Sequence, residues 1–466
     1  MSASAPEPIA TSLPKSLEAR HVAMISIGGI IGSGLFVGSS AAIAATGPVI
    51  LISYLLAGVV MLFIMRMLGE MAVATPGAGS FTEYIRLGLG NWAGFIAGWL
   101  YWGFWVLAIA LEAIAGASII APYINVPVWQ IGLVLLVAMS ALNLLSTRTY
   151  GESEFWLSLI KVVAIVAFII VGGIFVFGAA RQAGGWPANL YQHGGFAPFG
   201  PMSVFSGTTS VMLALVGAEI VTVAAAESKT PTTAIAQLTT TLIVRISIFF
   251  VASMFVIVCL VPWNTIQSGN SPFAMALSAM QVPLAPDIMN AVVVTATLSC
   301  LNSGVYVSSR VLHTLSNRGE APKWLTQANR RGVPDRAILL CMAGGMIGVV
   351  LAAFHPGGVL AFLVNATGSV MLVIYLMVAF AQIRNRYNLE RSAPERLQLK
   401  TWWFPWSSYA VIAVIGAVML AMALNKDLAS QVYASAACFV IAAAAYWAVT
   451  RVRRRQPPEL EAAQPE

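Results

Sequence analysis

Three ionisable side chains lie deep inside long apolar segments: Glu112, Lys161 and Glu219. A charge at the centre of a lipid bilayer costs at least about 2.5 kcal/mol, so such residues are rare unless they are used. Because keeping them charged is costly, these groups can gain and lose a proton, bind a ligand of opposite charge or pair with another helix. A purely structural charge is the alternative interpretation for each of them.

Two of the apolar segments are interrupted near their middle by residues that allow a helix to unwind. The first reads MISIGGIIGSGLFVGSS, around Gly32 and Gly34, and the second reads VMLALVGAEIVTVAAAES, around Gly217. An unwound segment exposes amide N–H groups on one half-helix and carbonyls on the other. The zwitterion of an amino acid needs both kinds of partner. The alternative is that these glycines only permit close helix packing.

The composition is that of a membrane protein. Of the 466 residues, 59% are apolar and only 9% are charged, whereas an ordinary soluble domain carries about 25% charged residues. This excludes a soluble enzyme, a disordered protein and, despite the net charge of +7, a nucleic-acid-binding protein. The four cysteines are scattered through apolar runs, so neither disulfides nor a metal site is expected. No cofactor is expected, because nucleotide-binding and metal-ligand motifs are missing.

The apolar segments predict an all-α membrane protein with twelve spans, because one span needs about 20 apolar residues. The predicted spans are 22–45, 48–73, 92–121, 128–146, 153–178, 201–227, 237–262, 286–315, 337–354, 358–383, 404–424 and 430–450. With the N-terminus inside, Arg181 and Lys426 lie outside, Lys161 lies within a span, and every other Lys and Arg lies inside. The positive-inside rule therefore places both termini in the cytoplasm.

The first and sixth spans, which carry the interruptions, each begin a set of five spans. Since five is an odd number, the second set enters the membrane from the opposite side, which predicts an inverted repeat with a broken helix at the start of each half. The expected organisation is a disordered tail at 1–14, the first repeat at 15–200, the second repeat at 201–400, two more helices at 401–455 and a disordered tail at 456–466.

Four stretches carry a resemblance to a known family. They are ARHVAMISIGGIIGSGLFVGSS at 19–40, GEMAVATPGAGSF at 69–81, EFWLSLIKVVAIVAF at 154–168 and AAAESKTPTTAI at 224–235. Over about residues 15–450 the chain resembles the amino acid transporter branch of the amino acid–polyamine–organocation superfamily. Within that branch, GAEIVTVAAAES followed by RISIFFVASMFVIVCLVPWN looks closest to bacterial 4-aminobutyrate permeases.

This resemblance implies a LeuT-type fold, proton-coupled uptake and a substrate site at the two interruptions. It also implies that Lys161 fills the place that sodium takes in sodium-coupled relatives, between the first and eighth spans. The candidate substrate-binding residues are Ile31, Gly32, Ser33, Gly34, Glu112, Val216, Gly217, Ala218, Glu219 and Asn302. The candidate proton-coupling residues are Lys161 and Glu219. The alternatives are that Lys161 is a fixed charge between helices and that Glu219 caps the broken helix.

One helix face of the predicted eighth span is polar. Ser299, Asn302, Ser303, Tyr306 and Arg310 recur there at spacings of three and four residues. This face could border the substrate site and Lys161, or it could form hydrogen bonds between helices.

We predict a proton-coupled amino acid importer of the bacterial inner membrane that works by alternating access, with 4-aminobutyrate as the leading substrate. Its partners would be an amino acid, the proton and the lipid bilayer, without nucleic acid, and the chain would not be an enzyme. The alternatives are a permease for lysine, an aromatic amino acid, proline, D-alanine or glycine, an exchanger without net proton movement, and an amino acid sensor. The oligomeric state stays open.

Overall fold

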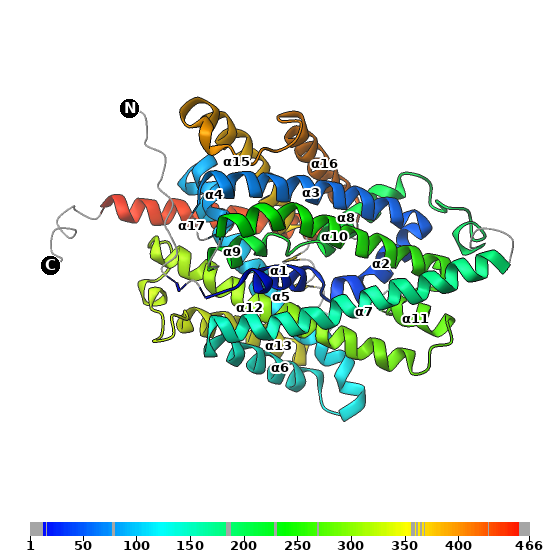
Figure 1. The fold of residues 1–466 in the computed structure, drawn as a ribbon. Helices are drawn as coiled ribbons and strands as arrows, with labels where there is room; N and C mark the ends of the chain where they lie inside the picture. Colours follow the sequence, from blue (N-terminus) through cyan, green and yellow to red (C-terminus); the bar gives the residue numbers. More distant parts are fainter. Residues whose placement is uncertain are drawn as a thin grey trace.

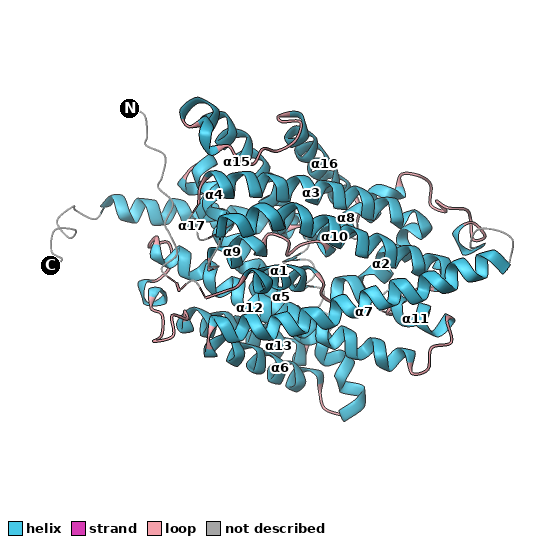
Figure 2. Ribbon diagram, viewed as in Figure 1, coloured by secondary structure: helices cyan, strands magenta, loops and turns pink. Residues whose placement is uncertain are grey.

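The chain folds into a bundle of helices in a computed structural model (Figure 1). The structure describes residues 13–14, 16–76, 80–182, 188–227, 231–267, 270–355, 359, 362–363, 366–367, 369–426 and 428–455. Within these residues the regular elements are helices, and there is no β-strand (Figure 2). The predicted tails lie outside the described residues, except for Leu13 and Pro14.

The first part of the chain contains one broken helix followed by long ones. Its α-helices are α1 (Ala19–Ile30), α2 (Ser39–Thr46), α3 (Ile50–Ala74), α4 (Phe81–Leu89), α5 (Asn91–Ile124), α6 (Val128–Leu145) and α7 (Thr147–Gln182). A turn of π-helix at Gly34–Gly38 connects the break after α1 to α2. The short α4 begins where the Ser80 hydroxyl accepts a hydrogen bond from the Thr82 N–H at 3.4 Å.

The second part also starts with a broken helix. Its α-helices are α8 (Ser203–Ala214), α9 (Ile220–Ala226), α10 (Pro231–Leu260), α11 (Pro272–Ala279), α12 (Ala285–Asn317), α13 (Asp335–Phe354), α15 (Val370–Ser392), α16 (Trp406–Leu424) and α17 (Ala429–Arg455). Here α8 and α9 are the two halves of the broken helix, separated by residues 215–219.

Eight helical ranges among the described residues are long and apolar enough to cross a membrane. They are Ala19–Ala74, Asn91–Ile124, Val128–Leu145, Thr147–Gly178, Ala285–Asn317, Asp335–Phe354, Trp406–Leu424 and Ala429–Arg451. The chain is therefore a helical, multi-pass membrane protein.

Helices that are far apart in the sequence pack around α1 near the centre of the bundle (Figure 1). α1 contacts α7, α9, α10 and α12, while α12 lies along α5 and α10 lies along α3. Small residues permit the close approach of α5 and α12: Gly98 faces Leu315, and Gly304 faces Trp105 and Ile109. Long continuous helices therefore surround the two broken helices.

The end of the bundle where α1 begins and α17 ends carries buried ion pairs, and we call it the basic end. Arg86 of α4 donates two hydrogen bonds of 2.7 Å to Glu320 and contacts Glu83 at 3.3 Å. Arg318 forms a second ion pair with Glu83. Burial raises the pKa of the Glu320 carboxyl above its ordinary value, and the hydrogen bond from Arg86 opposes this shift. These charges fasten α4 to the end of α12.

Two more buried pairs close the basic end elsewhere. Arg386 of α15 contacts Glu70 of α3 at 2.9 Å, and Arg310 of α12 contacts Glu227, just after α9, at 3.0 Å. Breaking one partner of a buried pair leaves an uncompensated charge, which is strongly destabilising. These pairs therefore connect α15 to α3, and α12 to the chain after α9, at the basic end.

Candidate functional site

The first broken helix stops in the middle of the bundle. α1 ends at Ile30, and the next residue, Ile31, has a ψ of 83°, outside the helical range. The chain then turns at Gly32 and Ser33 before the π-helix begins at Gly34. The end of α1 consequently presents backbone carbonyl oxygens that lack a following helical turn, and such oxygens attract cations.

The second broken helix meets the first at this level. Gly217 lies between α8 and α9 with a φ of +111°, which an L side chain rarely adopts. A Cβ atom on Gly217 would collide with the carbonyl oxygen of Gly29 and would lie 3.2 Å from the Ile30 nitrogen. The two breaks are therefore in backbone contact, and only a glycine fits between them.

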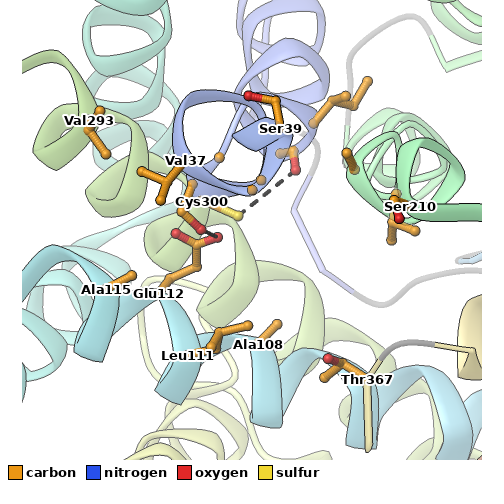
Figure 3. Close-up of a pocket in the computed structure, with 18 of the residues that line it drawn as sticks. Val37, Ser39, Ala108, Leu111, Glu112, Ala115, Ser210, Val293, Cys300 and Thr367 are labelled. Carbon is orange, nitrogen blue, oxygen red and sulfur yellow. Dashed lines mark hydrogen bonds between the residues drawn. The ribbon is translucent and has the colours of Figure 1, made fainter. Parts of the chain in front are cut away.

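A cavity of about 600 Å³ lies beside the breaks. Figure 3 shows Ala108, Leu111, Glu112 and Ala115 following one another along α5 on one side, with Ser210 of α8 opposite. The lining extends from the breaks along α2 and the later part of α5, away from the basic end. A mostly apolar cavity of this size with few polar groups is typical of a small-molecule site.

Glu112 is the one ionisable carboxyl among the described residues that line this cavity. Its Oε1 accepts a hydrogen bond of 2.9 Å from the Ser33 hydroxyl, at the first break. Its Oε2 is buried without a hydrogen-bond partner among the described residues. Gly32 lets the carboxylate come this close, because a Cβ there would lie 3.0 Å from Oε1. Glu112 thus has, beside the cavity, one carboxylate oxygen that no described residue satisfies.

Lys161 ties the first break to α12. Its Nζ donates three hydrogen bonds of 2.8 Å each, to the carbonyl oxygens of Gly28 and Ile31 and to the Ser299 hydroxyl. The side chain is fully buried. The positive charge therefore sits where the carbonyl end of the α1 dipole points.

A buried glutamate lies on the far side of Ser299. Glu154 Oε1 accepts hydrogen bonds from Ser299 and, at 3.0 Å, from Ser158, and its Oε2 accepts one of 2.8 Å from Asn302. Glu154 is completely buried. With Lys161 it forms a compact pair of opposite charges, joined through a hydroxyl.

The Glu219 carboxylate accepts three hydrogen bonds at the second break. Its Oε1 accepts a hydrogen bond of 3.1 Å from the Tyr101 hydroxyl, and its Oε2 accepts one of 2.8 Å from Tyr375 and one of 3.1 Å from the Gly217 N–H. The residue is completely buried. In this conformation the carboxylate accepts from a backbone amide within the break and joins α5 to α15.

We expect Glu219→Gln to abolish accumulation of substrate against its gradient. The amide nitrogen of glutamine cannot accept a hydrogen bond, so at least one buried donor at the second break loses its partner, at a cost of about 1–3 kcal/mol. Uptake into proteoliposomes measures the effect. Tyr101→Phe is the comparison that keeps the carboxylate and removes one of its three hydrogen bonds. Wild-type accumulation by Glu219→Gln would show that transport does not require the Glu219 carboxylate.

The structure divides the predicted site residues into two groups. Those that line the cavity are Gly32, Ser33, Gly34, Glu112 and Val216. Those that lie behind its described lining are Ile31, Lys161, Gly217, Ala218, Glu219 and Asn302. Asn302 donates to Glu154 and accepts a hydrogen bond of 2.9 Å from Asn143, so its amide belongs to the network behind the cavity.

Two residues of this region were not among the predicted ones. The predicted span 153–178 puts Glu154 at its start, but α7 begins at Thr147, so Glu154 lies two turns inside the helix. Its spacing of seven from Lys161 puts both on one helix face, a signal present in the sequence. Gln431 of α17 lines the cavity, and its buried Oε1 has no hydrogen-bond partner within the described part of the chain. A helix predicted to lie outside both repeats thus reaches the site.

Comparison with known proteins identifies the family. Residues 21–459, nearly the whole chain, match the amino acid permease family. The chain belongs to this family. The permease is therefore a transporter of amino acids, as the motifs predicted, and the prediction that it is not an enzyme is confirmed by the family.

Curated relatives cover the permease almost completely. It is 42% identical over 459 residues to the gamma-aminobutyric acid permease of Bacillus subtilis, covering 98% of this chain and 97% of the relative. It is 44% identical over 412 residues to the gamma-aminobutyric acid permease of Escherichia coli, covering 87% and 88%. An aromatic amino acid transport protein of Corynebacterium glutamicum is 35% identical over 431 residues, covering 91% and 92%.

A solved structure shares the fold of the permease. The crystal structure of a manganese transporter from Eremococcus coleocola superposes with a TM-score of 0.58, covering 96% of this chain and 98% of that one. At 13% sequence identity this likeness concerns the fold alone. Among the described residues of the permease no group of three or more His, Cys, Asp or Glu side chains could hold a metal ion.

Proposed function

We propose that the permease imports 4-aminobutyrate together with protons across the bacterial inner membrane. The relatives named as gamma-aminobutyric acid permeases, which are 42% and 44% identical to this chain, support the substrate. The observation that carries the coupling is the position of Lys161, whose Nζ joins two carbonyls at the first break to Ser299 of α12. A proton that leaves this amine removes the charge that holds α1 against α12.

The proposed architecture is a LeuT-type fold of twelve spans with a five-plus-five inverted repeat at 15–200 and 201–400, followed by two helices at 401–455. The breaks after Ile30 and Ala214, one in each half, support this arrangement. The basic end would face the cytoplasm by the positive-inside rule, with both termini there. The cavity, which extends away from that end, would then receive substrate from outside.

In the proposed binding mode the two charges of 4-aminobutyrate are bound by different elements. The ammonium group meets the free Oε2 of Glu112 on α5. The carboxylate meets the backbone amides at the start of the π-helix, from Gly34 onward. The charges of 4-aminobutyrate are further apart than those of an α-amino acid, and a cavity of about 600 Å³ has room for the longer molecule.

Uptake of radiolabelled 4-aminobutyrate into proteoliposomes, with a proton gradient directed inward, tests this function. We expect accumulation that a protonophore collapses and that other ω-amino acids inhibit, while proline, lysine, D-alanine and phenylalanine do not. Accumulation that requires internal substrate would show an exchanger instead. Uptake of a competitor without uptake of 4-aminobutyrate would keep the transport mechanism and overturn the substrate.

We expect Glu112→Gln to weaken substrate binding about 10- to 100-fold. A hydrogen bond to a charged group contributes about 1.5–3 kcal/mol, and glutamine keeps the size of the side chain while losing the charge. The half-saturating concentration of 4-aminobutyrate should rise by that factor. Ser118→Ala, at another polar position of the lining, should change it much less. An unchanged concentration in Glu112→Gln would exclude Glu112 as the ammonium site.

A further inference from the structure

We propose that Glu154 receives the proton of Lys161 through the hydroxyl of Ser299, so that the coupling group is a triad rather than a lysine alone. The inference rests on the proposed function in one respect, which is that transport moves protons. It assigns a part to Ser299 and Glu154, which are not among the described residues that line the 600 Å³ cavity and which the sequence motifs do not single out for coupling.

The hydrogen bonds of Lys161 leave one route for its proton. The ammonium group has three N–H donors, and three acceptors surround it, each at 2.8 Å: Gly28 O, Ile31 O and Ser299 Oγ. The two carbonyl oxygens accept a proton in a hydrogen bond but have none of their own to pass on. A hydroxyl accepts with its lone pairs and donates with its O–H, so Ser299 alone of the three can relay a proton.

Ser299 is already oriented for this relay. Its Oγ accepts from Lys161 and donates to Glu154 Oε1, which gives a continuous chain of donors and acceptors in one direction. Ser158 and Asn302 donate to the same carboxylate at 3.0 Å and 2.8 Å. Since every contact of Glu154 is with a donor, the carboxylate is held as an acceptor at the end of the chain.

The step conserves protons and charge. One N–H bond of Lys161 breaks as an O–H bond forms at Ser299 Oγ, while the original O–H bond of Ser299 breaks as a new one forms at Glu154 Oε1. The products are a neutral amine and a neutral carboxylic acid. The uncharged amine attracts the carbonyls of Gly28 and Ile31 less strongly, so α1 is released from α12. Proton transfer is thereby linked to movement of the broken helix.

The ionisable groups around the triad leave Glu154 as the acceptor. Glu112 of α5 and Cys300 of α12 are the other ionisable groups near Lys161 besides Glu154. Glu112 Oε1 takes its hydrogen bond from Ser33, and none of the three Nζ hydrogen bonds goes to Glu112 or Cys300. Glu154 is the carboxylate that a single hydroxyl links to the amine.

Polar residues continue from Glu154 toward the basic end. On α7, Thr147 and Tyr150 lie on the same helix face as Glu154, at spacings of three and four. The Tyr150 hydroxyl lies 3.3 Å from Ser303 Oγ, and Thr147 Oγ1 accepts from Arg310 at 3.2 Å. Two facing polar stripes, one on α7 and one on α12, therefore connect the triad with the end of the bundle through which the proton would leave.

The matched variants Ser299→Ala and Ser158→Ala test the triad in proteoliposomes that contain a pH-sensitive dye. Each removes one hydroxyl that donates to Glu154 Oε1, but only Ser299 lies between Lys161 and Glu154. We expect proton influx that accompanies 4-aminobutyrate uptake to fall at least about tenfold in Ser299→Ala and to change less than about twofold in Ser158→Ala. Equal influx in the two variants would overturn the proposal.

Glu154→Gln supplies the second measurement. Glutamine keeps the size of the side chain but cannot take up the proton. We expect this variant to exchange labelled for unlabelled 4-aminobutyrate at a rate independent of pH, and to lose proton-driven accumulation. Wild-type accumulation and wild-type proton influx in Glu154→Gln would overturn the triad. If Glu154→Gln also fails to exchange, the comparison of Ser299→Ala with Ser158→Ala is the test of the triad.

The wild-type protein separates this proposal from the proposed function. If uptake by the wild type brings no protons into the vesicles, proton coupling itself is wrong. If the wild type brings protons in and Ser299→Ala and Glu154→Gln do so equally, the proposed function stands and only the triad fails.

Discussion

Replacing Lys161 by methionine will abolish accumulation of 4-aminobutyrate against its gradient. Methionine keeps an unbranched side chain of similar length but has no donor for Gly28 O, Ile31 O or Ser299 Oγ. Each of these hydrogen bonds involves a charged group and is worth about 1.5–3 kcal/mol. Glu154 would also be left as a buried carboxylate without its cation, which is costly. The loss of coupling should therefore be complete.

Lys161→Arg is the matched control for this prediction. Arginine keeps the positive charge but does not release its proton in a protein. If Lys161 were only a fixed charge that holds α1 to α12, Lys161→Arg would retain part of the uphill uptake. If Lys161 gives up a proton in each cycle, both variants should fail to accumulate substrate. Initial rates and final accumulation, measured at several external pH values, distinguish the two roles.

Replacing Gly217 by alanine will abolish transport for a purely geometric reason. The φ of +111° is strained for any residue with a Cβ, at about 1–3 kcal/mol. The added methyl group would also collide with the backbone carbonyl of Gly29, which cannot move aside as a flexible side chain could. The two breaks would have to separate, and the site that depends on their contact would be lost.

The measurement for Gly217→Ala is uptake at equal amounts of reconstituted protein, with thermal stability in detergent recorded alongside. Gly173→Ala on α7 is the control, since a Cβ there meets no atom within 4 Å. It should transport like the wild type. If Gly217→Ala also did so, the contact between the breaks would not be required, and the binding mode proposed for the first break would have to be abandoned.

Both predictions concern the half-helix α1 and the contacts that hold it in place. The half-helix α1 is held by Lys161 on one side and by the second break on the other, and it contacts α7, α9, α10 and α12. The buried ion pairs of the basic end connect the surrounding helices at the end of the bundle where α1 begins. Release of α1 from α12 and opening of these pairs would together expose the site to the opposite side of the membrane.

Several features of the permease could be predicted from the sequence because they are local. Apolar runs of about 20 residues indicate helices in a membrane without knowledge of their neighbours. Glycines in mid-span indicate where a helix can unwind, and the structure has breaks beside Gly32 and at Gly217. A charge inside an apolar run stands out against its surroundings, and this pattern singles out Glu112, Lys161 and Glu219.

The partners of these residues were decided only by the tertiary structure. Ser299, which bonds to Lys161, is 138 positions away from it, and Tyr375 is 156 positions from Glu219. A polar residue that another helix satisfies looks in the sequence like any serine or tyrosine in a span. Helical spacing could have pointed to Glu154 beside Lys161, but not to its donor Asn302, which another helix brings in. Sequence patterns report the periodicity of one helix, whereas the proposed coupling group and the cavity arise from packing between helices, and Gln431 of α17 contributes to the cavity.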